Sequence, residues 1–195
     1  MRVYVVYCHP LAESFTAAIR DRAVAALASA GHEVRLTDLY GENFQPELTA
    51  WERVHHLDSP DQKPAILPYA EHLRWCDALV FVYPTWWSGQ PAMLKGWIDR
   101  VWVSGVAYEL PDGGNRIRPR LRNIRRIAAI TTHGSSKSVN ALQGEGGKRI
   151  ISRSLRVLCH PLARTRWVAL YSIDRCTDAD RTKFLDRVER SMHRL

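Results

Sequence analysis

Short runs of apolar, often β-branched residues alternate along the chain with segments whose apolar positions recur every three or four residues. The first pattern predicts strands and the second predicts helices. Ser14 is a suitable N-cap for the first helix, and Gly31 ends its apolar spacing. The predicted strands are Arg2–Cys8, Glu33–Leu39, Ala78–Tyr83, Ile127–Thr132 and Trp167–Tyr171. The predicted helices are the segment between Ser14 and Gly31, Tyr69–Trp75, Pro91–Val103, Gly147–Leu158 and Asp178–His193.

This alternation of strands and helices predicts a single α/β domain over residues 1–195, an open five-stranded parallel sheet with helices on both faces. The uninterrupted apolar run Ala78–Tyr83 is typical of a central strand that is buried on both sides. Residues 41–68 contain several prolines and acids, and we expect them to form an excursion with a short helix. Ligands of such sheets bind beyond the carboxyl ends of the strands.

Composition and charge narrow the class of protein only slightly. A net charge of +8 favours phosphates and other anions as partners, and 46% hydrophobic residues are enough to form a core. The first residues lack the basic and apolar regions of a signal peptide, and no apolar stretch approaches the length of a membrane span. We therefore expect a cytoplasmic protein without membrane insertion.

The cysteines do not predict a metal site. Cys8, Cys76, Cys159 and Cys176 are scattered without a C-x-x-C pair, which favours reduced thiols. The pentapeptide Cys-His-Pro-Leu-Ala occurs at residues 8–12 and again at 159–163, but the flanking sequences share no period. Two Cys-His pairs without close ligand spacing do not match a zinc module, so no bound metal is expected.

Three loops at the predicted carboxyl ends carry unusual residues. The first contains His9 and the hydroxyls of Ser14 and Thr16 beside a helix N-terminus, which suits a phosphate, although Ser14 has an alternative interpretation as an ordinary cap. The second places Trp86 beside Trp87, where a flat ligand could stack, or where the indoles could serve packing. The third, 131–136, offers hydroxyls and a histidine.

In combination these loops resemble the NAD(P)H:quinone oxidoreductase family of flavodoxin-like fold. The matching pieces are His9-Pro10 with Ser14-Phe15-Thr16, Tyr83-Pro84 to Trp87, Gln90 to Val101, Gly105 to Tyr108, Thr131 to Gly134, and Leu142-Gln143-Gly144. The segment Pro-Ala-Met-Leu-Lys-Gly-Trp-Ile-Asp-Arg-Val after a double tryptophan is the most specific of them.

The resemblance implies a tightly held flavin, FAD or alternatively FMN. Its phosphate end is expected near His9, Ser14, Phe15 and Thr16, its ring over Pro84, Thr85, Trp86 and Trp87, and its pyrimidine edge beside Thr131, Thr132, His133 and Gly134. The resemblance further implies that NAD(P)H donates a hydride and departs, after which a quinone-like acceptor occupies the same place. Tyr108 matches an aromatic position of the acceptor pocket, usually beside a partner subunit, which implies a homodimer.

The chain departs from the family at the positions associated with proton management. A tyrosine and a histidine of the better-known relatives are replaced by Asn140 and Gly146, and Ser88 replaces an aromatic residue. His133 stands where the family commonly has glycine, so it is a candidate catalytic imidazole beside the flavin. The alternative interpretation is a solvent-facing loop histidine without a chemical role.

The arginines of residues 116–126 precede the fourth predicted strand and form the most basic part of the chain. They could receive an anionic group such as the 2′-phosphate of NADPH, or form a solvated loop. The segment lacks interleaved aromatic residues and any known nucleic-acid motif, so no nucleic-acid partner is expected.

Two other functions remain open from the sequence. One is a flavodoxin-like carrier of single electrons, although such carriers are usually acidic and have a hydroxyl-rich first loop. The other is a flavin-binding regulatory subunit of a potassium efflux transporter, because some bacterial relatives in the family resemble ancillary proteins of such systems and use the same fold to bind the transporter.

Overall fold

The computed structural model describes residues 1–111 and 114–195. Five parallel strands form the sheet in the order β2-β1-β3-β6-β7. They are β1 (Arg2–Tyr7), β2 (Glu33–Asp38), β3 (Ala78–Pro84), β6 (Arg126–Thr132) and β7 (Arg164–Leu170). This confirms the predicted five-stranded parallel sheet. Because the order runs outward in both directions from β1 and β3, the winding reverses between these two strands, and a ligand crevice is expected there.

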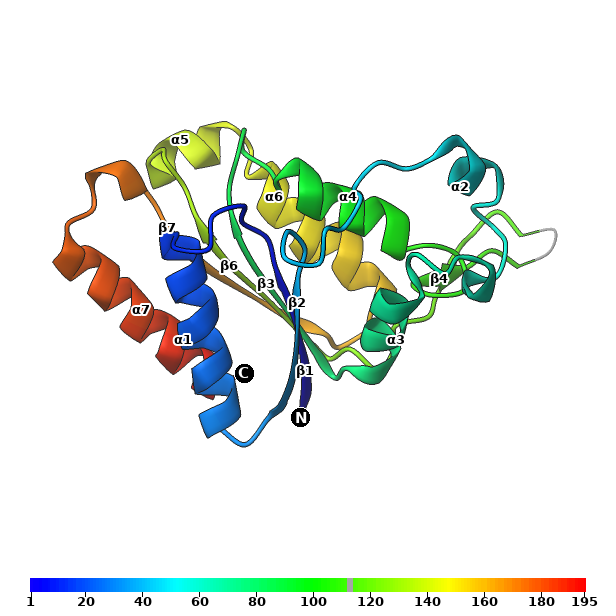
Figure 1. Cartoon of the computed structure of the whole chain (residues 1–195), viewed down its shortest axis with the longest axis horizontal. Helices are drawn as coiled ribbons and strands as arrows, with labels where there is room; N and C mark the ends of the chain where they lie inside the picture. The colour runs from blue at the N-terminus through cyan, green and yellow to red at the C-terminus, as the bar shows by residue number, and fades with distance from the viewer. Residues whose placement is uncertain (112–113) are drawn as a thin grey trace.

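Helices cover both faces of the sheet (Figure 1). One face carries α1 (Phe15–Ser29) and α7 (Asp178–His193), which lie side by side. The other carries α3 (Leu67–Trp75), α4 (Ala92–Val101), α6 (Gly146–Arg149) and the π-helical and 3₁₀ turns η2 (Ile150–Leu155) and η3 (Arg156–Leu158). Each face has its own core, because side chains alternate along the strands: Val3 and Val5 of β1 join α1 and α7, whereas Tyr4 and Val6 join α3 and α4.

Several elements differ from the sequence prediction. The helix expected over Gly147–Leu158 is divided into α6, η2 and η3, and a further helix, α5 (Lys137–Leu142), precedes it. The excursion over residues 41–68 does contain the expected short helix, α2 (Ala50–Val54). It also contains the 3₁₀ turn η1 (Pro60–Gln62), and another such turn, η4 (Ile173–Arg175), precedes α7. A two-stranded antiparallel pair, β4 (Tyr108–Glu109) with β5 (Arg118–Pro119), was not predicted, and β5 lies among the arginines of residues 116–126.

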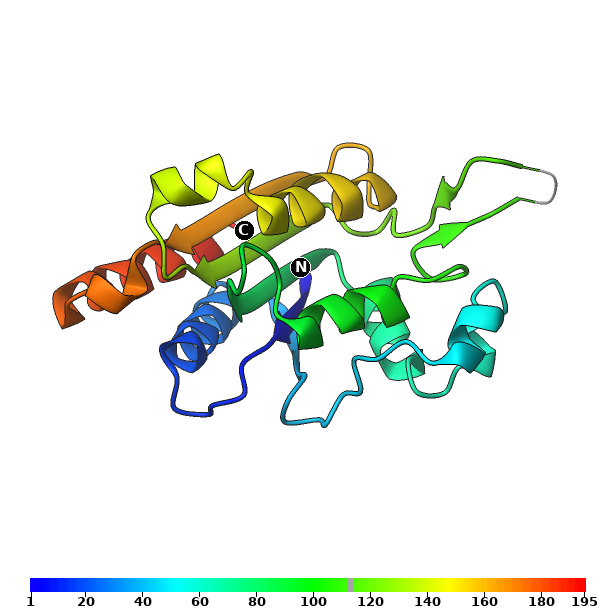
Figure 2. The ribbon, with the colours of Figure 1, turned by 90° about the horizontal axis from the view of Figure 1, so that it is seen from above.

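The antiparallel pair and α2 lie beyond one end of the sheet (Figure 2). Part of the expected excursion over residues 41–68 therefore forms, together with β4 and β5, a small extension of the domain. Among the described residues, no helix is both long enough and apolar enough to cross a bilayer.

Candidate functional site

The carboxyl ends of β1, β3 and β6 bring the three unusual loops together. The rings of His9 and Trp86 lie with centroids 6.3 Å apart, which joins the first loop to the second. The Oγ1 atoms of Thr85 and Thr131 lie 2.9 Å apart, which joins the second to the third. The three loops therefore meet at the carboxyl ends of the strands, as the sequence indicated.

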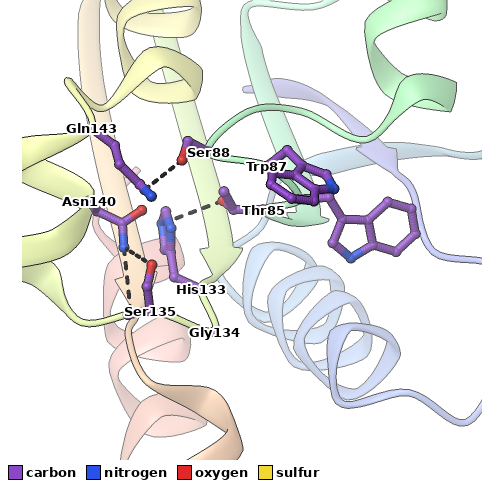
Figure 3. Close-up of a pocket in the computed structure, with 9 residues that line it drawn as sticks. Thr85, Trp87, Ser88, His133, Gly134, Ser135, Asn140 and Gln143 are labelled. Atoms are coloured by element: carbon purple, nitrogen blue, oxygen red, sulfur yellow. Dashed lines mark hydrogen bonds between the residues drawn. The ribbon is translucent and has the colours of Figure 1, made fainter.

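A cavity of about 450 Å³ opens between the loop after β3 and the loop after β6 (Figure 3). Its lining consists of Thr85, Trp86, Trp87, Ser88, His133, Gly134, Ser135, Asn140 and Gln143. This volume lies within the roughly 300–1,000 Å³ that small-molecule and cofactor sites occupy. We call it the strand-end cavity.

The loop after β3 holds its second tryptophan in a strained turn. Trp86 and Gly89 exchange backbone hydrogen bonds of 3.2 and 3.0 Å, and the two residues between them have positive φ, 49° at Trp87 and 61° at Ser88. This backbone normally requires Asn or Gly, and a bulky residue in it is an outlier. Trp87 is 103% exposed, so no packing within the chain compensates the strain. Such strain is typical of a functional position.

His133 forms part of the cavity wall and is 6% exposed, so the solvent-facing interpretation is wrong. Its ring stacks on Tyr171 with centroids 4.7 Å apart, and its Nε2 lies 3.5 Å from Thr85 Oγ1 (Figure 3). Its Nδ1 is buried and has no hydrogen-bond partner among the described residues. Burial lowers the pKa of the imidazole, and nearby Asn140 and Glu145 only partly offset this, so the ring is neutral at neutral pH.

The wall beside His133 is completed by α5, which the sequence did not predict (Figure 3). Asn140 is buried, and its Nδ2 donates to Ser135 Oγ at 2.8 Å and to Ser136 O at 2.9 Å. Ser88 Oγ donates to Gln143 Oε1 at 2.6 Å and ties the β3 loop to this helix (Figure 3). Ser135 and Gln143 were not among the expected site residues. Ser136, which caps α5, was the signal that could have located this wall.

Polar backbone groups face the same edge of the sheet. The amides of Phe15 and Thr16, in the first turn of α1, and those of Gly134 and Ser135 donate to no protein acceptor within the described residues. Ser14 Oγ accepts from Ala17 N at 3.1 Å, so Ser14 does cap the helix. These free amides suit an anion or a carbonyl-bearing ligand.

Not every expected residue lies open to the strand-end cavity. Thr16 is 4% exposed, and Phe15 packs with Phe184, the ring centroids lying 6.2 Å apart. Pro84, Thr131 and Thr132 are buried residues at the ends of β3 and β6. Tyr108 does not reach the site within the chain, because it belongs to β4 and lines a different cavity.

The arrangement fits a flavin. An isoalloxazine is flat and aromatic, and Trp86 and Trp87 offer indoles that are 42% and 103% exposed. The free amides at 134–135 and the unpartnered Nδ1 of His133 supply hydrogen-bonding groups at one side of the cavity, and the amides at 15–16 can donate to the oxygens of a phosphate. The exposed tryptophans and the orphaned polar groups would thus be satisfied by the same ligand.

A family profile described as flavodoxin-like fold matches residues 1–162. The chain belongs to the flavodoxin-like fold family. A flavodoxin-like structure of the same kind, the NAD(P)H:quinone oxidoreductase from Methanothermobacter marburgensis, superimposes with a TM-score of 0.81 at 28% identity, covering 99% of this chain and 96% of the other.

Two curated relatives carry related names. The uncharacterized NAD(P)H oxidoreductase YcaK of Escherichia coli is 39% identical over 112 residues, which cover 55% of this chain and 55% of the relative. The NAD(P)H dehydrogenase [quinone] 1 of Rattus norvegicus is 32% identical over 165 residues, covering 75% of this chain and 58% of the rat protein. The match thus spans little more than half of each relative. The resemblance found in the sequence is confirmed.

Proposed function

We propose that this flavodoxin-like protein is a flavin-dependent oxidoreductase that passes two electrons from NAD(P)H to a quinone-like acceptor. The observation that carries the proposal is the strand-end cavity, in which a solvent-exposed Trp87 in a strained turn stands across from a buried, neutral His133. The names of the relatives support the same reaction class.

In this proposal the flavin is FAD or, alternatively, FMN, and its ring lies over Pro84, Thr85, Trp86 and Trp87. Its phosphate end lies at the N-terminus of α1, near His9 and Ser14. A bound flavin supplies hydride acceptance and two-electron chemistry, which no side chain of the protein supplies. The tryptophans orient the ring and exclude water from its face. The amides of Gly134 and Ser135 donate toward its edge and stabilise negative charge there.

The proposed catalytic part of His133 follows from its two nitrogen atoms. When Nε2 accepts from the Thr85 hydroxyl, the neutral ring carries its proton at Nδ1, for which the described residues offer no hydrogen-bond partner. His133 can then donate a hydrogen bond from Nδ1 to the ligand edge. Stacking on Tyr171 fixes the plane of the ring in which that proton lies.

Donor and acceptor are proposed to use the same cavity in turn. Both ligands would stack at the same exposed indoles, Trp86 and Trp87, so the oxidised nicotinamide leaves before the acceptor enters. This order predicts substituted-enzyme kinetics, in which parallel lines appear in double-reciprocal plots of rate against NAD(P)H at several acceptor concentrations.

We further propose a homodimer in which Tyr108 of one subunit borders the acceptor pocket of the other. Within one chain Tyr108 lines another cavity, so a part at the strand-end cavity requires a second copy. Sedimentation equilibrium tests the dimer, and an activity loss in Tyr108→Ala that leaves flavin content unchanged would support the placement.

The decisive experiment is an absorption spectrum of the purified protein, followed by anaerobic addition of NADH and then NADPH. Bands of an oxidised flavin that bleach directly to the two-electron reduced form, and recover with a quinone, are expected. Release of the flavin distinguishes FAD from FMN. Absence of flavin after reconstitution would refute the proposal, and flavin that ignores both nicotinamides would favour a single-electron carrier or a transporter subunit instead.

A further inference from the structure

A second cavity, of about 230 Å³, lies between α2, the segment after it, the end of α4 and β4. We call it the Lys63 cavity. Leu48, Arg53, Lys63, Trp102, Val103 and Tyr108 are among its lining residues, and it shares none with the strand-end cavity. Its volume is below the roughly 300–1,000 Å³ of sites for drug-sized ligands, so its ligand must be small.

Lys63 is a buried cation without an acidic partner. The residue is 4% exposed, and its Nζ donates to the backbone oxygens of His56 at 3.3 Å and Asp58 at 3.2 Å. Within the described residues no carboxylate forms an ion pair with it. Lysine is rarely buried unless it is paired, and an ammonium group has three donors, of which only two are used here. One donor of the ammonium group therefore has no acceptor, and its charge has no ion-pair partner, in the part of the chain that the structure describes.

The carboxylates that line the cavity are already engaged. Glu52 pairs with Arg100 at 2.6 Å, and their side chains are only 11% and 7% exposed. Asp99 pairs with Lys95 at 2.6 Å on the outer side of α4. Arg53 adds another cation to the wall. The cavity consequently has a surplus of positive charge that no side chain within residues 1–111 and 114–195 pairs with.

The remaining walls are apolar and aromatic. Trp102 and Val103 are buried, 7% and 9% exposed, and Leu48 and Tyr108 complete the lining. The indole Nε1 of Trp102 is buried and has no hydrogen-bond partner in the part of the chain that the structure describes. The cavity thus combines an unsatisfied cation and an unsatisfied donor with surfaces that hydrated inorganic anions do not match.

We propose that the Lys63 cavity binds a small organic anion, one carboxylate attached to an apolar body. The carboxylate neutralises Lys63, and the apolar body lies against Trp102, Val103 and Tyr108. Burial already lowers the pKa of the Lys63 ammonium, which Asp58 and Glu52 only partly restore, so a bound carboxylate stabilises its charged form.

The test is isothermal titration calorimetry of the purified protein with sodium benzoate as the probe, at constant ionic strength. Neutral benzamide has nearly the same shape without the charge, and inorganic phosphate has the charge without the apolar body. Lys63→Met keeps the volume of the side chain and removes the buried charge, so it should fold. Lys183→Met, at an exposed position of α7, is the matched control.

We expect saturable one-to-one binding of benzoate, and dissociation constants at least tenfold higher, about 1.4 kcal/mol, for Lys63→Met and for the other two probes. Lys183→Met should bind as the wild type does. The Trp102 indole resonance in a ¹H–¹⁵N spectrum, assigned by its loss in Trp102→Phe, should shift with benzoate. The proposal is overturned if benzoate does not saturate, if Lys63→Met binds it equally well, or if phosphate binds as tightly. None of these readouts depends on flavin or turnover.

Discussion

At the scale of single residues, burial decides the charge of the one imidazole in the strand-end cavity. A group whose pKa is lower in the folded state takes up its proton first in the unfolded state as the pH falls. The free energy of unfolding contributed by neutral His133 is therefore present above the ordinary histidine pKa of about 6.5 and is lost below it.

The first prediction concerns His133→Asn, which removes this titration. Between pH of about 7.5 and about 5.5 the wild type should lose more free energy of unfolding than the variant. In the wild type the unfolded state takes up a proton on residue 133 that the folded state resists, and the variant has no imidazole there. Urea unfolding at both pH values measures it, with the exposed His193→Asn as the control. Equal losses in all three proteins would show that His133 does not titrate as its burial implies.

The second prediction concerns the strained turn. A bulky residue with positive φ costs about 1–3 kcal/mol, and Asn adopts this backbone more easily than Trp. Trp87→Asn should relieve part of that strain and raise the free energy of unfolding by up to about 1 kcal/mol. The same change should weaken flavin retention, because it removes an indole from the site. Trp87→Phe keeps an aromatic ring and should change both quantities less. A destabilised Trp87→Asn would contradict the strain argument.

At the scale of elements, α4 depends on one glycine. A Cβ atom added at Gly96 would lie 2.2 Å from the backbone oxygen of Pro46, so the helix and the segment after β2 approach more closely than any side chain permits. The glycine of Lys-Gly-Trp is part of the segment that resembles the family, and this close approach to Pro46 explains why a residue without a side chain stands there.

The third prediction follows from this contact. Gly96→Ala should lower the free energy of unfolding by about 1–3 kcal/mol, the usual effect of overpacking, although alanine by itself favours a helix by about 1 kcal/mol. Gly146→Ala is the matched control, because its added Cβ would lie 3.6 Å from Ser88 O, an ordinary contact. Thermal unfolding compares them; a Gly96→Ala protein as stable as the control would refute the contact.

Some elements of the fold could be predicted from the sequence, and others could not. The buried strands could be predicted because β1, β3 and β6 consist of apolar runs. The pair β4 and β5 could not, because each strand has two residues and Arg118 lies among other arginines, where no alternation can be recognised. The loop residues of the site followed from strand ends, but Gln143 lies at the C-terminal end of the short helix α5, whose six residues carry little periodicity.

At the scale of the whole molecule, the extension that contains α2 is attached to the sheet domain through α4. The guanidinium of Arg100 contacts both Glu52 of α2 and the backbone oxygen of Gln45. Burial alone would raise the pKa of Glu52, but Arg100 and Thr49 lower it below its usual value, so the pair stays ionised at neutral pH. No motif in the sequence indicated this pairing of residues 48 positions apart.

The fourth prediction is that Arg100→Met releases this extension. Breaking a buried ion pair typically costs about 3–5 kcal/mol, because the partner charge stays buried. Trypsin should therefore cleave after Arg53 and Lys63 much faster than in the wild type. Lys95→Met removes an exposed pair on the same helix and should change little, since such pairs contribute about 0–1 kcal/mol. Equal cleavage rates in both variants would exclude a special part for Arg100.

The exposure of Trp87 also matters for the protein as a colloid. The indole of Trp87 is fully exposed and lies beside the 42% exposed Trp86. Together they form an aromatic surface patch, prone to self-association, on a molecule with a net charge of +8. The net charge keeps copies apart at low salt, but added salt screens that repulsion and leaves the indoles free to meet. Aggregation of concentrated protein at high salt should accordingly be faster when no ligand covers these indoles. An increase in light scattering during storage would then report the loss of the ligand.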